Sequence, residues 1–365
     1  MINVTKTNLP KIETYIKYLK KIWKTKWLTN DGPFLQLLEK KLARYLKVEN
    51  LLLVSSGTSA LQLSLKALKL KGEIITTPFT FVATTNIILW EKLMPVFADI
   101  DPETFNIDPH DVEKKITRKT SAILAVHVYG NPCYINELKK IADKYHLKLI
   151  YDAAHAFGVE YNYQSILNAG DISTLSFHAT KIFNTIEGGA IVVKNKKIFE
   201  ELKLLRNFGI KSEGKVILPG INAKMNEFQA AMGLCNLENT DKNIRSRKKL
   251  YEYYKKELID IKNIKFQKII ASKYNYIYMP ICLGGKKERD KIYSELIKNE
   301  IKPRKYFFPL TTNFDYFKNK KINLTKKYNL KNASNIANRV LCLPLYPELK
   351  IKIVNKIIKI IKSVK

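Results

Sequence analysis

Short apolar runs alternate with helical periods through the first half of the chain. Apolar positions recur every 3.6 residues from Ile12 to Trp23 and again from Phe34 to Tyr45, which predicts two helices. Seven short runs predict strands: Leu51–Val54, Glu73–Thr76, Val96–Ala98, Ala122–Val126, Lys148–Tyr151, Thr174–Phe177 and Ala190–Val193. Helical patterns fill several of the gaps: Ser59–Leu68, Phe81–Trp90, Pro109–Ile116 and Ile135–Tyr145. Strands alternating with helices predict an α/β fold with a mainly parallel, seven-stranded sheet.

The pattern changes after residue 240. Residues 225–257 are helical, with an interruption near Asn239–Asp241. Strands are then predicted at Tyr276–Leu283 and Ile301–Phe307, and helices at Glu288–Ile297, Asn332–Val340 and Leu349–Val364. We therefore expect a large domain over residues 1–240 and a smaller α+β domain over residues 241–365.

Composition narrows the class of protein. With 46% hydrophobic residues among 365, the chain can bury a sizeable core, so a wholly disordered protein is excluded. No apolar run approaches the ~20 residues that span a bilayer, and the first residues lack the apolar core of a signal peptide, so we expect a cytoplasmic protein. Cysteines at 133, 235, 282 and 342 form no C-x-x-C pair, and we expect reduced, buried thiols and no metal site.

The net charge of +31 raises the possibility of a basic nucleic-acid-binding protein. The lysines, however, are spread along the whole chain. The densest stretches, Lys17–Lys26 and Lys350–Lys365, alternate with apolar residues at helical spacing, which is typical of solvated helix faces. No helix-turn-helix, zinc or aromatic-basic motif is visible, so we expect neither nucleic acid nor membrane as a partner. A positive field would still attract a phosphorylated small substrate.

Three polar motifs follow predicted strands, at the edge where ligands of parallel sheets bind. SSGTSA (Ser55–Ala60) opens a helix with a glycine turn, which suits a phosphate, although serine and threonine are also ordinary helix caps. Asp152 follows the fifth strand and could equally serve a turn. Lys181 lies past the sixth strand, before a Gly-Gly turn, where desolvation could make its amine nucleophilic.

A phosphate site, an acid and an amine together are what pyridoxal phosphate requires. The lysine amine attaches to the cofactor aldehyde, an aspartate keeps the ring nitrogen protonated, and a helix N-terminus binds the phosphate. Phe81 could stack on the ring, although by itself a place in a helix core is its more ordinary interpretation.

The chain also resembles the DegT/DnrJ/StrS sugar aminotransferases, which have the pyridoxal-phosphate-dependent, type I aspartate-aminotransferase fold. The resemblance runs from about Trp27 to the C-terminus. It rests on seven motifs in matching order: SSGTSAL (Ser55–Leu61), TTPFTFVAT (Thr76–Thr84), PVFADIDPETFNID (Pro95–Asp108), HVYGNPC (His127–Cys133), YDAAHAFG (Tyr151–Gly158), SFHATK…EGG (Ser176–Gly189) and LCLPLYP (Leu341–Pro347).

The resemblance implies a role for each residue of the cofactor site. Lys181 is the lysine that carries the cofactor, and Asp152 pairs with the ring nitrogen. His155 lies beside the ring where many members have glutamine, and Phe81 stacks on it where others have tryptophan or tyrosine. The implied phosphate contacts are Thr58, Ser59, Ser176 and Asn222. Because dehydratases of this group have histidine in place of the lysine, Lys181 favours transamination over dehydration or a non-catalytic relative.

The resemblance also implies partners. The segment Gly220–Met225, with Lys224 where members often have arginine, is similar to one that reaches a neighbouring subunit's site, which implies a homodimer with shared sites. Trp27 and Thr29 belong to a WLTNDGP stretch similar to that of C4 aminotransferases. Arg304 could contact a diphosphate and Tyr306 could line the sugar. An ordinary solvent-exposed charge with no ligand is an equally good interpretation of Arg304.

The implied reaction transfers the amine of glutamate to a nucleotide-linked keto-6-deoxy sugar. The best match is dTDP-4-keto-6-deoxy-D-glucose, aminated at C4 for surface polysaccharide. Amination at C3 of a dTDP-3-keto-6-deoxyhexose, or at C4 of a UDP-sugar, stays open.

Overall fold

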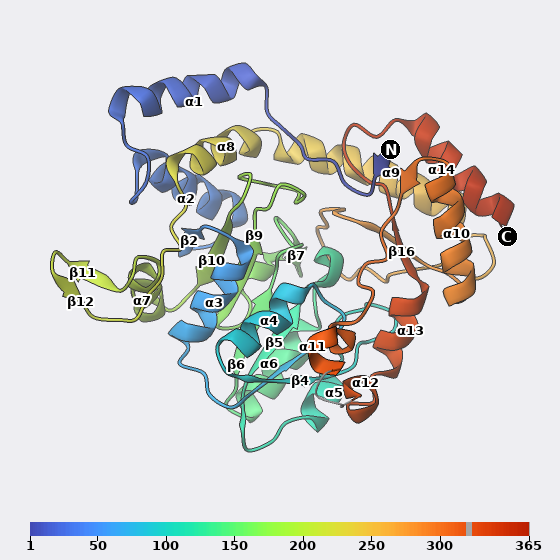
Figure 1. Ribbon diagram of the computed structural model, residues 1–365, viewed down its shortest axis with the longest axis horizontal. Coiled ribbons are helices and arrows are strands. Elements are labelled where there is room, and N and C mark those ends of the chain that lie inside the picture. Colours follow the sequence, from blue (N-terminus) through green and yellow to red (C-terminus); the bar gives the residue numbers. More distant parts are fainter. Residues whose placement is uncertain (319–322, 365) are drawn as a thin grey trace.

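A seven-stranded sheet forms the centre of the computed structural model, which describes residues 1–318 and 323–364 (Figure 1). Its strands are β2 (Leu51–Val54), β3 (Glu73–Thr76), β4 (Met94–Phe97), β5 (Thr120–Val126), β6 (Lys148–Asp152), β9 (Ile172–Ser176) and β10 (Gly189–Val193). They lie in the order β2-β10-β9-β6-β5-β3-β4, and only β10 runs antiparallel to its neighbours. The predicted α/β fold and mainly parallel sheet are confirmed, with strand ends shifted by at most two residues.

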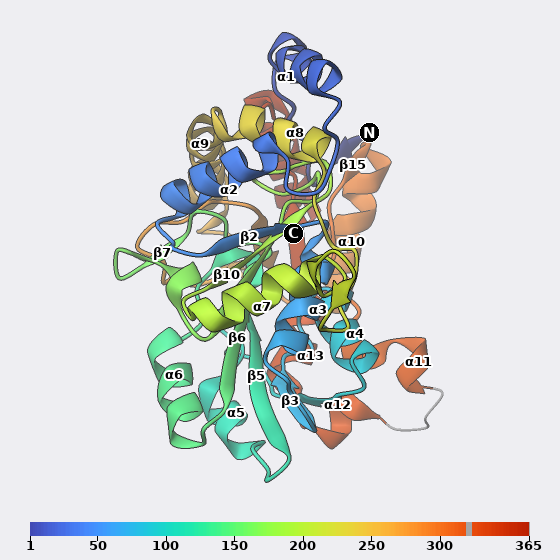
Figure 2. The ribbon, with the colours of Figure 1, turned by 90° about the vertical axis from the view of Figure 1, so that its left-hand side faces the viewer.

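Both faces of the sheet are covered by helices, as a parallel sheet requires (Figure 2). Leu52 and Val54 face α3 and α7, whereas Leu51 and Leu53 face α2 and α8. The helices are α2 (Pro33–Leu46), α3 (Gly57–Ala67), α4 (Val82–Trp90), α5 (Pro109–Lys114), α6 (Ile135–Lys144), α7 (Lys196–Arg206) and α8 (Glu227–Leu237). This alternation along β2 explains why the strand reads as a continuous apolar run.

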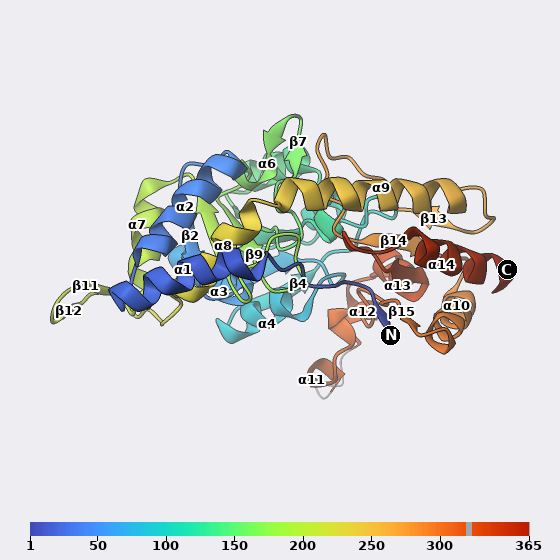
Figure 3. The same ribbon diagram turned by 90° about the horizontal axis from the view of Figure 1, so that it is seen from above.

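The C-terminal part has its own core. The long helix α9 (Thr240–Leu258) runs from α8 toward the C-terminal elements (Figure 3). An antiparallel sheet is formed by β13 (Lys265–Phe266), β14 (Met279–Cys282) and β16 (Val340–Leu343), in that order. It packs with α9, α10 (Lys286–Lys298) and α14 (Ile351–Val364), which confirms the α+β pattern. Helix α13 (Lys331–Arg339) packs instead against the core of the large part. The boundary at 240/241 stays a prediction, and it falls at the start of α9.

The N-terminal segment spans both parts of the molecule. Strand β1 (Ile2–Asn3) pairs in parallel with β15 (Ile301–Lys302), beside the C-terminal elements (Figure 1). Helix α1 (Ile12–Thr25) then lies along α8, where the Tyr15 hydroxyl donates to the Phe228 carbonyl at 3.1 Å. The sequence pattern did not predict β1, because two residues carry no periodicity.

The predicted strand over residues 301–307 is wrong beyond Lys302. Pro303 has no N–H to donate to a ladder, and Arg304 makes only an isolated bridge to Cys342. The chain then turns away from the sheet, so the residues from Arg304 onward are free to border the cavity described below.

The remaining elements are short. The β11–β12 hairpin projects from the body of the protein (Figures 1 and 3). These elements are β7 (Glu160–Tyr161), β8 (Gln164–Ser165), β11 (Ile210–Ser212), β12 (Lys215–Val216), α11 (Asp315–Lys318) and α12 (Leu324–Lys327), with 3-10 turns at Val128–Gly130, Ile166–Asn168 and Thr311–Asn313. All four cysteine side chains are buried and unbridged. Within the described ranges, none of the helices has the length and apolar character needed to cross a membrane.

Candidate active site

A cavity of about 290 Å³ opens where the carboxyl ends of the parallel strands meet the segment after β15. Eight of the residues singled out from the sequence border it: Thr58, Phe81, Asp152, His155, Ser176, Lys181, Arg304 and Tyr306. They come from five separate stretches of the chain, and the strand order brings them together.

The N-terminus of α3 provides an anion site at one end of the cavity. Ser56 and Ser59 form a reciprocal cap, in which each backbone N–H donates to the other's hydroxyl at 3.0 Å. The N–H groups of Gly57 and Thr58 have no hydrogen-bond acceptor among the described residues, and both residues border the cavity. Ser59 therefore serves the helix cap, and Ser56 borders the cavity in its place. Free N–H groups at a helix N-terminus suit a phosphate.

Gly57 allows the N-terminus of α3 to lie close to the end of β9. A Cβ at this position would lie 2.8 Å from the Cβ of Ser176, which ends β9. The helix N-terminus can therefore approach the strand end closely enough for the Ser176 hydroxyl and the free N–H groups to face one anion. This placement fits the phosphate of pyridoxal phosphate.

Asp152 lies buried at the end of β6, with 6% of its surface exposed. Its carboxylate accepts from the Thr84 hydroxyl at 2.8 Å and from the Ala154 N–H at 3.1 Å. Burial raises the pKa of this carboxyl, while the two hydrogen bonds and the charge of Lys181 partly oppose the rise. A buried carboxylate fixed in this way suits a cationic ring nitrogen. Thr84 was not singled out from the sequence, because its side chain becomes a partner of Asp152 only through the fold.

Lys181 lies partly buried in the loop between β9 and β10. Burial lowers the pKa of its amine to about 8. The negative charge of Asp152 opposes this shift, and the positive charge of Arg304 adds to it. A larger share of this amine is therefore unprotonated near neutral pH than of an exposed lysine. An unprotonated amine is the form that can attack a carbonyl carbon.

Aromatic rings form the opposite wall. The buried His155 ring lies parallel to Phe307, with centroids 5.9 Å apart, and tilted to Tyr306. Burial holds the pKa of His155 well below its usual range, so the ring is neutral. Phe81 precedes α4 and is 49% exposed at the cavity, so its alternative place in a helix core is wrong. The available ring surfaces fit a flat heteroaromatic group.

Arg304 is exposed and lies over the Tyr306 ring, with its guanidinium carbon 3.9 Å from the ring centroid. It borders the cavity together with Lys181, so its charge faces the site. An anionic group of a substrate would meet this guanidinium first.

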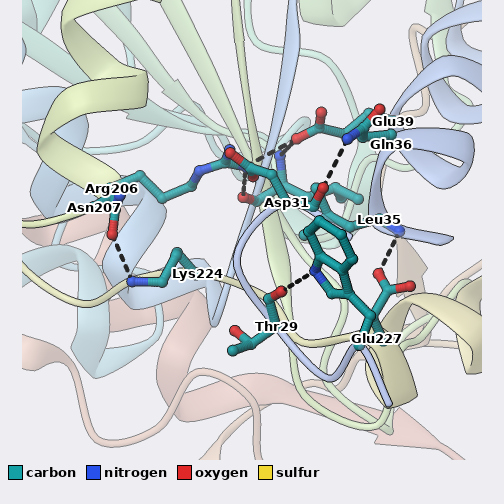
Figure 4. Close-up of polar contacts among 11 residues, drawn as sticks. Thr29, Asp31, Leu35, Gln36, Glu39, Arg206, Asn207, Lys224 and Glu227 are labelled. Atoms are coloured by element: carbon teal, nitrogen blue, oxygen red, sulfur yellow. Dashed lines mark hydrogen bonds and ion pairs between the residues drawn. The ribbon is translucent and has the colours of Figure 1, made fainter. Parts of the chain in front are cut away.

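Besides Ser59, four predicted residues lie outside this cavity of the chain: Trp27, Thr29, Asn222 and Lys224. The Lys224 amine instead donates to Asn207 Oδ1 at 2.7 Å, and the Trp27 indole N–H donates to the Thr29 carbonyl at 2.5 Å (Figure 4). Asn222 bridges to Asn207 through its backbone. Their predicted contacts with cofactor or substrate are therefore not made with this chain's own cavity.

Arg206, which sequence reasoning missed, fixes the segment that carries Trp27 and Thr29 (Figure 4). The buried guanidinium donates to Asp31 at 2.5 Å, to Glu39 at 3.0 Å and to the Leu53 carbonyl at 2.9 Å. These contacts join α7, α2 and β2, the strand that leads to the phosphate end. The role of Arg206 could not be predicted from nearby residues, because its partners lie far away along the chain.

Glu227 fixes the same segment from the other side. Its carboxylate accepts from the N–H groups of Phe34 and Leu35, each at 2.9 Å, and so caps α2 from another helix. A Cβ on Gly32 would lie 2.4 Å from the Glu227 carboxyl carbon, so a larger residue there would displace the carboxylate that caps α2.

Comparison with known proteins agrees with this geometry. The DegT/DnrJ/EryC1/StrS aminotransferase family matches residues 11–362. The dTDP-4-amino-4,6-dideoxy-D-glucose transaminase of Shigella dysenteriae is 45% identical over 100% of this chain and 99% of its own length. DesI, crystallised with its TDP-sugar product, is 30% identical, with a TM-score of 0.92 over 99% of this chain and 92% of its own. NtdA of Bacillus subtilis, with bound PMP, is 29% identical, with a TM-score of 0.89 over 97% of this chain and 81% of its own. The chain therefore belongs to the DegT/DnrJ/EryC1/StrS aminotransferases, a pyridoxal-phosphate-dependent family.

Proposed function

We propose that this aminotransferase moves the amino group of L-glutamate to dTDP-4-keto-6-deoxy-D-glucose and so forms dTDP-4-amino-4,6-dideoxy-D-glucose. The observation that carries the proposal is the single cavity shared by Lys181, Asp152 and the N-terminus of α3. The choice of sugar rests on the name of the Shigella dysenteriae relative and on its identity over the whole chain. A product of this kind suits surface polysaccharide synthesis.

Different residues of the cavity would bind the cofactor, hold its charge and move the proton. Bound pyridoxal phosphate supplies an electron sink for the carbon that gains or loses the amine. The Gly57 and Thr58 N–H groups and the Ser176 hydroxyl bind the phosphate, and the Asp152 carboxylate holds the positive charge of the ring nitrogen. Phe81 covers the ring. Lys181 Nζ would hold the cofactor aldehyde, and the same amine, when free, would accept and return the proton of the reacting carbon.

A homodimer with shared sites is part of the proposal. Asn222 and Lys224 lie outside their own chain's cavity, which supports a role in a second copy's site. Exposed apolar side chains lie on α1, in the segment that Arg206 fixes, and between residues 208 and 217, and a second copy would cover them: Trp23, Trp27, Leu28, Phe208, Ile210 and Ile217. The cytoplasmic location stays a prediction.

Mixing two inactive variants tests the shared site. Lys181→Ala and Asn222→Ala each disable a different part of the proposed composite site. If the sites are shared, refolding the two variants together should restore up to about a quarter of the wild-type activity, because half of the dimers are mixed and each mixed dimer has one intact site. No recovery, in a protein that sediments as a monomer, would contradict the shared site.

The substrate is tested with ¹⁵N-labelled glutamate and three keto sugars: dTDP-4-keto-6-deoxyglucose, dTDP-3-keto-6-deoxyglucose and a UDP-linked 4-keto-6-deoxy sugar. Products are identified by mass, and the new C–N bond is located by NMR. We expect ¹⁵N at C4 of the first sugar and none with the Lys181→Ala variant. Label at C3, or turnover only with the UDP-sugar, would overturn the choice of sugar. Absence of label in every sugar would overturn the aminotransferase function.

A further inference from the structure

His178 and Glu187 face each other across the base of the loop that carries Lys181. Ser176 pairs with Gly189, and the Phe177 N–H donates to the Gly188 carbonyl at 2.8 Å, so the next pair outward is His178 with Glu187. Their Nε2 and Oε1 atoms lie 3.5 Å apart. Both residues border the cavity, and their side chains are 46% and 55% exposed. The pair therefore forms part of the mouth of the site.

The contacts of the His178 ring assign its tautomer. Nδ1 accepts from the Thr180 N–H at 3.2 Å, so in the neutral ring the proton lies on Nε2, which faces Glu187. A separation of 3.5 Å exceeds that of an ordinary hydrogen bond. The Nε2 donor and the Glu187 carboxylate thus retain capacity for a third group.

The backbone holds this pair close to the reacting amine and to the phosphate end. The His178 carbonyl accepts from the Lys181 N–H at 2.9 Å, so both residues belong to one turn. A Cβ on Gly189 would lie 2.6 Å from the Ser56 carbonyl oxygen, which shows how closely the strand after Glu187 packs against the α3 cap. The backbone thus holds His178 and Glu187 at the mouth of the cavity.

We propose that His178 and Glu187 select the sugar by binding a ring hydroxyl beside the keto carbon, an inference that rests on the proposed function. A hydroxyl both accepts and donates a hydrogen bond, so it can accept from His178 Nε2 and donate to the Glu187 carboxylate. The carboxylate of glutamate cannot donate, and its charge would be repelled by Glu187. The pair thus favours the sugar over the amino donor.

Separate half-reactions test the proposal. Mixing the aldehyde form of the holoenzyme with glutamate measures amine uptake, and mixing the amine form with dTDP-4-keto-6-deoxyglucose measures amine delivery, each followed by the absorption of the cofactor. Glu187→Gln removes the charged acceptor. His178→Asn removes the Nε2 donor but keeps an acceptor for the Thr180 N–H. We expect Glu187→Gln to raise the half-saturating sugar concentration about tenfold or more, in line with one lost hydrogen bond to a charged group. His178→Asn loses a bond between neutral groups and should raise that concentration about threefold or more. Both variants should leave glutamate uptake within about twofold.

Deoxy sugars identify the hydroxyl. Wild-type enzyme should react at least about tenfold better with the parent sugar than with its 3-deoxy analogue, which lacks the hydroxyl beside the keto carbon, and Glu187→Gln should lose that preference. The 2-deoxy analogue keeps that hydroxyl, so Glu187→Gln should leave its reactivity relative to the parent sugar unchanged. The matched control is Glu200→Gln, an equivalent change at a 56% exposed side chain outside the cavity, which should alter neither half-reaction. Unchanged sugar saturation in both variants, or equal losses in both half-reactions, would overturn this inference. Both results require active wild-type enzyme, so they differ from failure of the proposed function.

Discussion

Replacing Arg206 should destabilise the protein far more than breaking its outermost ion pair. Arg206→Met removes three hydrogen bonds and leaves the carboxylate of Glu39, 23% exposed, without its cationic partner. Removing one member of a buried pair costs ~3–5 kcal/mol. Asp31→Asn breaks only the pair to a side chain that is 57% exposed, for which we expect ~0.2–1 kcal/mol.

Denaturant unfolding of both variants measures the difference in free energy of unfolding.

The loss of stability in Arg206→Met should depend on pH. Burial raises the pKa of Glu39, and the charge of Arg206 opposes that rise. In Arg206→Met the folded chain therefore binds a proton at Glu39 more readily than the unfolded chain, so the deficit should shrink as the pH falls toward that pKa. An Arg206→Met deficit below ~1 kcal/mol, or one matched by Asp31→Asn, would refute this reasoning.

Three further predictions concern the site. Asp152→Asn keeps the shape but cannot hold the ring nitrogen's charge, and steady-state rates should fall at least ~10²-fold; a change of a few-fold would make Asp152 a turn residue. In cofactor-free protein, acetylation of Lys181 followed by peptide mass mapping should rise with pH through a midpoint near 8, and a midpoint near 10 would contradict its burial. Gly189→Ala would press a Cβ against the Ser56 and Leu175 carbonyls and should weaken cofactor binding at least ~10-fold in a fluorescence titration, whereas Gly285→Ala meets nothing within 4 Å and should not.

Much of the fold was predictable because buried strands and helices leave a clear pattern of apolar residues in the sequence. Strands covered on both faces read as apolar runs, and all seven were found in this way. Asp152 and Lys181 could be singled out because each follows such a strand, and parallel strands bring their carboxyl ends to one edge. Their places in the cavity thus follow from chain order, while their chemical roles stay predictions.

The missed features depend on contacts between distant segments. The partners of Arg206 on β2 and before α2 lie more than 150 residues away, and Glu227 caps a helix 193 residues before it. Ser59 shows a different limit, because one SSGTS motif can direct a hydroxyl either into the cap or toward a ligand. The strand that begins at Ile301 ends early because Pro303 has no N–H for the ladder. The sequence prediction extended it because apolar residues follow the proline.

In the proposed function, Lys181 carries the cofactor. Reducing the holoenzyme with borohydride fixes pyridoxal phosphate to whichever lysine holds it, and peptide mass mapping then locates the added mass. Among the lysines of the chain, we predict modification of Lys181 alone, with none in Lys181→Ala. Stoichiometric modification of another lysine in the wild-type enzyme, with Lys181 unmodified, would contradict it.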